Sequence, residues 1–220
     1  MRIVAGRVGT GKTQFVINEL WSELQMGRTC ALIQTSLNQT QVMKRIVEGC
    51  FVNGNQRIKN LEESPKSDEN EVEELLAPLV PLGNENLVFT LVCDKPEAPD
   101  QFLPLFGGLC ARLGGSSATR PLVAVDVLQD LPWFDNVSSS DSFKRYLELF
   151  AQIEKNAGVE IMVALQVLHF AGVADEAPEV IADRIRAMYP NAPVDRVTIC
   201  LDSYADKFGR RRVKSQEVVL

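Results

Sequence analysis

The segment Gly6-Arg7-Val8-Gly9-Thr10-Gly11-Lys12-Thr13 constrains this chain more than any other feature of the sequence. It matches the pattern GxxxxGK[ST] in full, directly follows an apolar run at 2–5, and precedes apolar residues at helical spacing. A glycine-rich turn between a strand and a helix can wrap its N–H groups around phosphate, and the helix N-terminus adds positive potential. The sequence therefore predicts a P-loop in which all eight residues contact a nucleotide.

Other side chains complete the predicted site. In a P-loop, Lys12 reaches the β- and γ-phosphates, and the Thr13 hydroxyl binds Mg²⁺. The magnesium also needs a carboxylate from another strand, and Asp126 ends the apolar run LVAVD. Gln166 ends the next apolar run and is a candidate to contact the γ-phosphate or the attacking water. We therefore predict ATP and Mg²⁺ as cofactors.

Apolar runs and amphipathic segments alternate along the chain, which predicts one α/β domain over residues 1–220. Expected strands cover 2–5, 29–34, 86–92, 121–125 and 159–165, and expected helices cover 12–26, 39–48, 99–113 and 141–156. These runs are almost wholly apolar, as in a parallel sheet covered on both faces. A helix at 179–188, a strand at 196–202 and a final segment at 213–220 predict an antiparallel C-terminal extension. Residues 54–85 are polar, and we expect a flexible insertion there.

Composition limits the classes of partner. The net charge is -6, so contact with nucleic acid requires a local basic patch, and five Lys or Arg residues cluster at 207–214. The sequence contains no apolar run of the ~20 residues that a membrane span needs. We expect a cytoplasmic protein that contacts no membrane. Its five cysteines, without a CxxC pair and with only His169 as histidine, indicate buried free thiols rather than a metal site.

Several segments, in order, resemble the DnaB-type replicative helicases, a family of RecA-like ATPases. The resemblance rests on AGRVGTGKT at 5–13, TSLNQTQVMKRI at 35–46, LVCDKP at 91–96, VDVLQDL at 125–131 and ALQVLH at 164–169. It implies a RecA-like P-loop core with a mostly parallel central sheet, in which Lys12, Thr13 and Asp126 bind Mg-ATP and Gln166 is the sensor. It also implies single-stranded DNA and a homo-oligomer, or a replication or recombination protein, as partners.

The sequence departs from this family at one chemical and one architectural point. Asn38 stands where the family has a catalytic glutamate, and an amide cannot accept a proton from water. Loss of a positioned base costs ~10²–10⁴ in rate, so we expect slow hydrolysis unless Glu48, Asp94 or Asp130 substitutes. The first strand begins at residue 2, so we also expect no N-terminal collar domain of the kind through which these helicases form rings.

The C-terminal basic residues have three open interpretations. By the resemblance, Lys207, Arg210 and Arg211 are candidates to reach a neighbouring subunit's nucleotide. They fit equally a patch for the nucleic-acid backbone or a solvated turn. His169 and Trp133 are interpreted as structural.

Three functions remain open from the sequence alone. The first is a helicase-like ATPase that acts with DNA. The second is an accessory protein that binds ATP without rapid hydrolysis and uses it to organise a partner interface. The third is a small-metabolite kinase, for which Arg184 and Arg186 are the only lid candidates.

Overall fold

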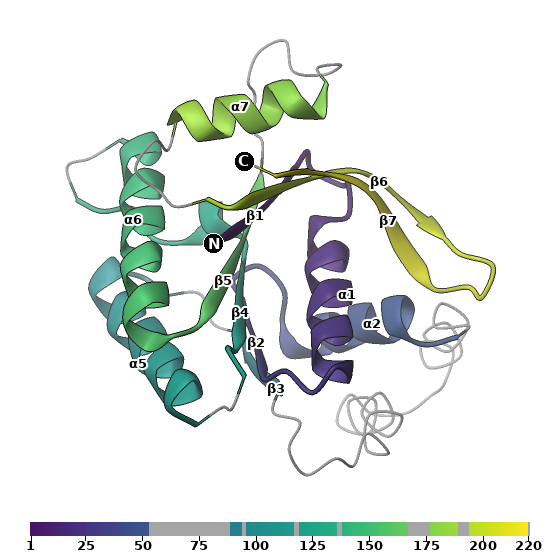
Figure 1. The fold of residues 1–220 in the computed structure, drawn as a ribbon, viewed down its shortest axis with the longest axis horizontal. Helices are drawn as coiled ribbons and strands as arrows, with labels where there is room; N and C mark the ends of the chain where they lie inside the picture. The colour runs from purple at the N-terminus through teal and green to yellow at the C-terminus, as the bar shows by residue number, and fades with distance from the viewer. Residues whose placement is uncertain are drawn as a thin grey trace.

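The computed structural model describes residues 1–52, 89–93, 96–116, 119–135, 138–166, 177–188 and 194–219. Strands and helices alternate along most of the chain (Figure 1). The strands are β1 Arg2–Gly6, β2 Cys30–Gln34, β3 Phe89–Cys93, β4 Leu122–Asp126, β5 Glu160–Gln166, β6 Arg196–Ala205 and β7 Arg211–Val219. The helices are α1 Lys12–Gln25, α2 Gln39–Cys50, α5 Pro99–Ser116, α6 Ser139–Ala157 and α7 Pro178–Met188, with a short 3-10 turn η2 at Leu128–Asp130.

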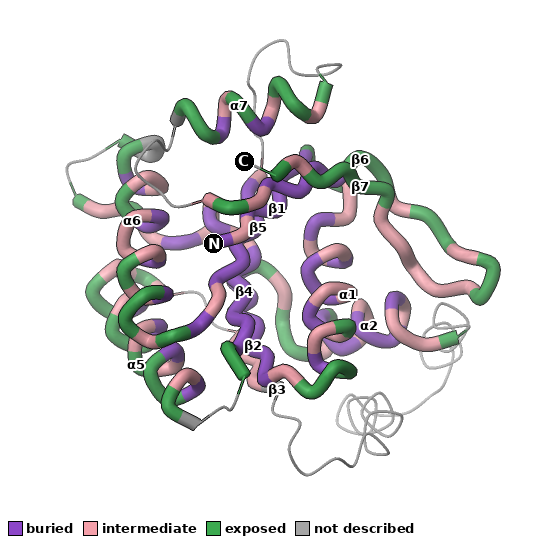
Figure 2. The backbone as a smooth tube through the Cα atoms, viewed as in Figure 1, coloured by how far each residue is buried: buried purple, intermediate pink, exposed green. Residues whose placement is uncertain are grey.

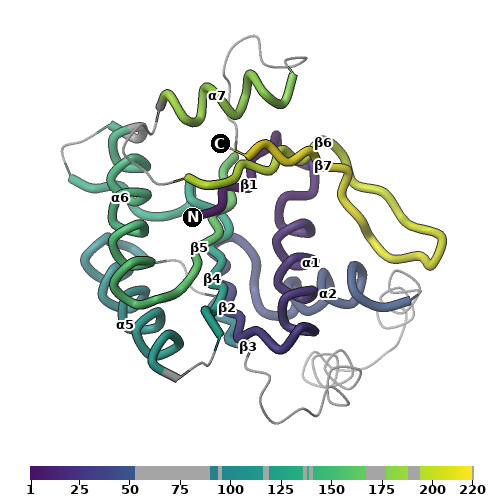
Figure 3. Tube along the Cα trace, in the orientation of Figure 1, coloured from purple at the N-terminus to yellow at the C-terminus, as the bar shows by residue number. Residues whose placement is uncertain are grey.

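The strands form one seven-stranded sheet in the order β3-β2-β4-β5-β1-β6-β7. Every pair is parallel except β6 with β7, which form an antiparallel hairpin. The far half of this hairpin extends beyond the rest of the sheet (Figure 3). Because the other strands are parallel, their carboxyl ends lie along one edge, where α/β proteins bind ligands. We call this the C-terminal edge.

Helices cover both faces of the sheet, as the apolar strands predict. Helices α1 and α2 pack on one face, and α5 and α6 pack on the other (Figures 1 and 2). Successive side chains of a strand point to opposite faces. In β4, for example, Leu122 and Ala124 belong to the core with α1, whereas Val123 and Val125 belong to the core with α5 and α6.

The predicted elements are found with small shifts at their ends. The expected α/β architecture, with a RecA-like parallel sheet and an antiparallel C-terminal extension, is confirmed. Helix α1 ends where expected, because Gly27 has a φ of +83° that suits glycine. Cys30, Cys110 and Cys200 are buried, and all five cysteines are free, as predicted. The expected insertion at 54–85 lies outside the described residues.

Candidate nucleotide site

Strand alternation brings three polar residues to one place. Gln34, Asp126 and Gln166 are the last residues of β2, β4 and β5, each an even number of residues from a side chain in the α1 core. Each therefore belongs to the sheet face that α1 covers, at the C-terminal edge. In register, Gln34 pairs with Asp126, and Gln166 pairs with Gly6 of the P-loop strand.

The P-loop has close backbone approaches at two glycines. A Cβ at Gly6 would lie 2.6 Å from Thr10 Oγ1 and 2.8 Å from the Cys200 carbonyl oxygen. Gly11 has a φ of +89°, and a Cβ there would lie 3.0 Å from Val213 Cγ2 of the hairpin. These positions account for two of the three motif glycines by space and backbone conformation.

Other P-loop groups surround the start of α1. Arg7, Val8 and Gly9 are exposed at the tip of the loop, whereas the Lys12 side chain is buried and donates to the Arg7 carbonyl oxygen at 2.6 Å. Burial lowers the pKa of Lys12, and the nearby charges of Asp126 and Cys200 oppose this shift. A lysine at this position, beside N–H groups of a helix N-terminus, can bind a phosphate oxygen.

Asp126 joins the P-loop across the sheet. Its side chain is 2% exposed and accepts hydrogen bonds from Thr13 and from Gln34 Nε2, the latter at 2.6 Å. Burial raises the pKa of Asp126, while these hydrogen bonds and the charge of Lys12 act in the opposite direction. A hydroxyl and a carboxylate are hard oxygen ligands, so Thr13 and Asp126 fit Mg²⁺. The structure thus brings together the predicted Lys12, Thr13 and Asp126.

Gln34 and Thr35 were not predicted as site residues. The Gln34 side chain is 1% exposed, and its Oε1 accepts from Ser36 N at 2.9 Å and Leu37 N at 3.3 Å. The Thr35 hydroxyl accepts from Val127 N at 3.0 Å, and Thr35 N donates to Asp126 O at 2.9 Å. The sequence does contain a signal for Gln34, because it is a polar residue that ends an apolar strand at the same edge as Asp126.

Gln166, the predicted sensor, is half-buried and is held by a second glutamine. Gln129 Nε2 donates to the Gln166 carbonyl oxygen at 2.9 Å, and the Gln166 amide donates to Gln129 Oε1 at 2.9 Å. These reciprocal bonds fix the end of β5 relative to the turn η2 that follows Asp126. They leave the Gln166 side chain to serve the predicted role, which stays a prediction.

Asn38, the position of the missing glutamate, has a local structural role. It is exposed and precedes α2, and its Oδ1 accepts from Gln41 N at 2.9 Å. The Gln41 side chain in turn accepts from Asn38 N at 3.0 Å, which completes a capping box. The side chain at this position therefore satisfies the first turn of α2.

The candidate substitutes for the glutamate differ in their surroundings. Glu48 pairs with Arg45 at 3.0 Å and with Arg211 of the hairpin at 3.2 Å. Asp130 is near enough to Asp126 to raise its pKa, and it lines a cavity of about 550 Å³ at the C-terminal edge. Trp133 lines the same cavity and is 58% exposed, so packing in the core does not explain this residue. Asp94 and His169 lie outside the described residues.

The predicted basic residues are on the hairpin but not all in the same setting. Arg210 pairs with Asp206 at 2.9 Å, and Arg211 pairs with Glu48 of α2. Lys207 is exposed at the tip, with its Nζ 5.0 Å from the centroid of the Phe208 ring. The base of the hairpin also contacts α1, because Asn18 donates to the Arg211 carbonyl oxygen at 3.2 Å. The hairpin tip is thus basic and aromatic, and its base is fixed beside the P-loop.

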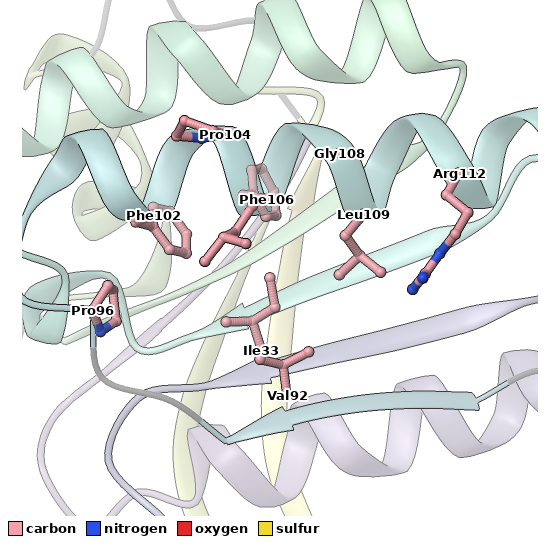
Figure 4. Close-up of a pocket in the computed structure, with 10 residues that line it drawn as sticks. Ile33, Val92, Pro96, Phe102, Pro104, Phe106, Gly108, Leu109 and Arg112 are labelled. Atoms are coloured by element: carbon pink, nitrogen blue, oxygen red, sulfur yellow. The ribbon is translucent and has the colours of Figure 1, made fainter.

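A further cavity lies away from these residues. It has a volume of about 390 Å³ and is lined mainly by apolar side chains of α5 together with Ile33 and Val92 (Figure 4). In the described part of the chain, no three His, Cys, Asp or Glu side chains gather as a metal-binding group. No helix within the same ranges is both long enough and apolar enough to cross a membrane.

Comparisons with known proteins show the fold. No protein-family model and no curated protein sequence matches this chain. Among solved structures, the ATPase domain of one DnaB-like helicase matches with a TM-score of 0.68 and 13% identity, covering 99% of this chain and 80% of that one. A DnaB-like replicative helicase, solved in a study of its interactions with primase, matches with a TM-score of 0.70 and 14% identity. That match covers 100% of this chain and 54% of the helicase, so this chain spans about half of the helicase's length. The chain therefore has the RecA-like fold of DnaB-like helicase ATPase domains.

Proposed function

We propose that this chain binds Mg-ATP and is a helicase-like ATPase that acts with DNA in replication or recombination. The observation that carries the proposal is the convergence of Lys12, Thr13 and Asp126 at the C-terminal edge, on a RecA-like fold. Lys12 binds and orients the β- and γ-phosphates, and the P-loop N–H groups hold their oxygens. Bound Mg²⁺, held by Thr13 and Asp126, would neutralise charge that develops on the transferred phosphoryl group.

Single-stranded DNA is the proposed macromolecular partner. The support is the hairpin tip, where Lys207 and Arg210 flank the exposed ring of Phe208. Basic side chains beside an aromatic ring suit phosphates and stacked bases. A neighbouring copy of this chain is the alternative partner for the same tip.

The test is ATP binding and hydrolysis by the purified protein, with and without single-stranded DNA. Lys12→Ala is expected to abolish both activities, whereas Lys155→Ala, which removes an exposed lysine of α6, leaves them unchanged. DNA-stimulated turnover that is absent from Lys12→Ala supports the proposal. Equal nucleotide binding by Lys12→Ala and the wild type would refute it.

An accessory role with slow hydrolysis is the second candidate, and the capping box of Asn38 favours it. A side chain that caps a helix and lacks a basic group cannot activate water. ATP that stays bound and intact for hours would support this role. Turnover at roughly 1 s⁻¹, at the low end for enzymes, would count against it.

A further inference from the structure

Gln34 has a side chain whose two ends make different bonds. Its amide nitrogen donates to Asp126 Oδ2 at 2.6 Å, and its carbonyl oxygen accepts from Ser36 N, Ser36 Oγ and Leu37 N at 2.9, 3.0 and 3.3 Å. Backbone N–H groups require an acceptor, and a carboxylate requires a donor. The amide orientation is therefore fixed by its neighbours at both ends, and neither Glu nor Leu could make both sets of bonds.

The position of Gln34 in the sheet makes this contact rigid. Gln34 and Asp126 are register partners on adjacent strands, and Thr35 bonds to the backbone of Asp126 and Val127 immediately beyond them. With Oδ2 held by Gln34, the plane of the Asp126 carboxylate is set relative to Thr13 on α1. Outer hydrogen-bond partners of this kind orient metal ligands.

We infer that Gln34 is a positioning residue, which holds Asp126 for the divalent cation of a nucleoside triphosphate and links that carboxylate to the Ser36–Leu37 turn before α2. This inference rests on the proposed function. It deepens that function, because it assigns the geometry of the cation site to a residue that contacts neither nucleotide nor cation. It also connects the cation site to the segment that contains Asn38.

The test measures the affinity for a fluorescent ATP analogue over a range of Mg²⁺ concentrations. For Gln34→Leu we expect the Mg²⁺ concentration at half-maximal effect to rise about 10- to 100-fold, the usual cost of losing such a partner. Affinity without Mg²⁺ should be unchanged, because Lys12 and the P-loop remain. Gln34→Met, with an unbranched side chain, is the second variant if Gln34→Leu fails to fold.

A matched control is available on α1. Gln14 is also a buried glutamine, at 2% exposed, but its amide donates to Asn18 Oδ1 and the Arg45 carbonyl oxygen instead. Gln14→Leu removes the same chemical group beside α2 and should keep the wild-type Mg²⁺ dependence. A general effect of losing a buried amide would shift both variants alike, and that result would overturn the inference.

Amide hydrogen exchange gives a second readout. In the wild type, Mg-ATP should slow exchange at Ser36 and Leu37 more than ATP alone, and in Gln34→Leu this difference should vanish. Wild-type Mg²⁺ dependence in a folded Gln34→Leu protein would overturn the inference and leave the proposed function intact. Absence of any nucleotide binding by the wild type would overturn both.

Discussion

The two edges of the sheet use polar groups in different ways. At the edge where β1 and β5 begin, Glu160 bonds to both Arg2 and Arg28, and Glu23 pairs with the same two arginines at 3.2 Å. At the C-terminal edge, by contrast, Asp126 is held mainly by neutral donors, Thr13 and Gln34, with Lys12 nearby. Opposite charges that satisfy one another close the first edge. At the second edge, a carboxylate held by neutral groups keeps its charge for a ligand.

The largest effect is expected from Asp126→Asn, which separates activity from stability. ATP turnover should fall on the order of 10²–10³-fold, as when other preorganised electrostatic groups are removed. The free energy of unfolding should be equal or higher, because burial of a carboxylate is costly and asparagine can still accept from Gln34. Steady-state kinetics and urea denaturation measure the two quantities. A marked loss of stability would show that this edge also holds the fold together.

The reverse pattern is expected for Glu160→Ala at the opposite edge. The free energy of unfolding should fall by about 2–3 kcal/mol, because hydrogen bonds from two arginines to a charged acceptor are lost. Nucleotide affinity should stay within twofold of the wild type. Weakened ATP binding at full folding would break the division of labour between the edges.

Glu160 also has an expected pH signature. Burial acts to raise its pKa, but the bonds from Arg2 and Arg28 prevail and lower it below the ordinary 4.5. A lowered folded-state pKa stabilises the fold above about pH 4.5, and this contribution is lost as the pH falls through the lower value. Urea denaturation between pH 6 and pH 3 should therefore show a steeper loss of stability for the wild type than for Glu160→Gln. Parallel curves would argue against this ion pairing.

The smallest effect is expected from Asn38→Ala. Loss of the cap should cost about 1 kcal/mol of stability, and Asn38→Asp should retain it, because both side chains cap helices well. ATP turnover by Asn38→Ala should equal that of the wild type. A turnover that falls tenfold or more would instead assign chemistry to this amide, and the helix cap would be its lesser role.

The sequence predicted those parts of the molecule that depend on short segments. The P-loop and the apolar runs that end in Asp126 and Gln166 are local patterns, so their elements were found within a few residues. Gln34 was missed because its importance depends on pairing with a strand 92 residues away along the chain. Asn38 was assigned by resemblance to a catalytic position, whereas its bond to Gln41 depends on local helix geometry. Trp133 was interpreted as structural, and only the packing of η2 shows that it is exposed.

The alternation of side chains along the strands also limits how this protein can evolve. Gln34, Asp126 and Gln166 share a face only while β2, β4 and β5 keep their phase. Deletion of one residue within Leu122–Val125 would turn Asp126 toward α5 and α6, and every core side chain before it would change faces. Deletion of two residues would preserve the phase. Homologues should therefore vary in loop length far more freely than in the length of these three strands.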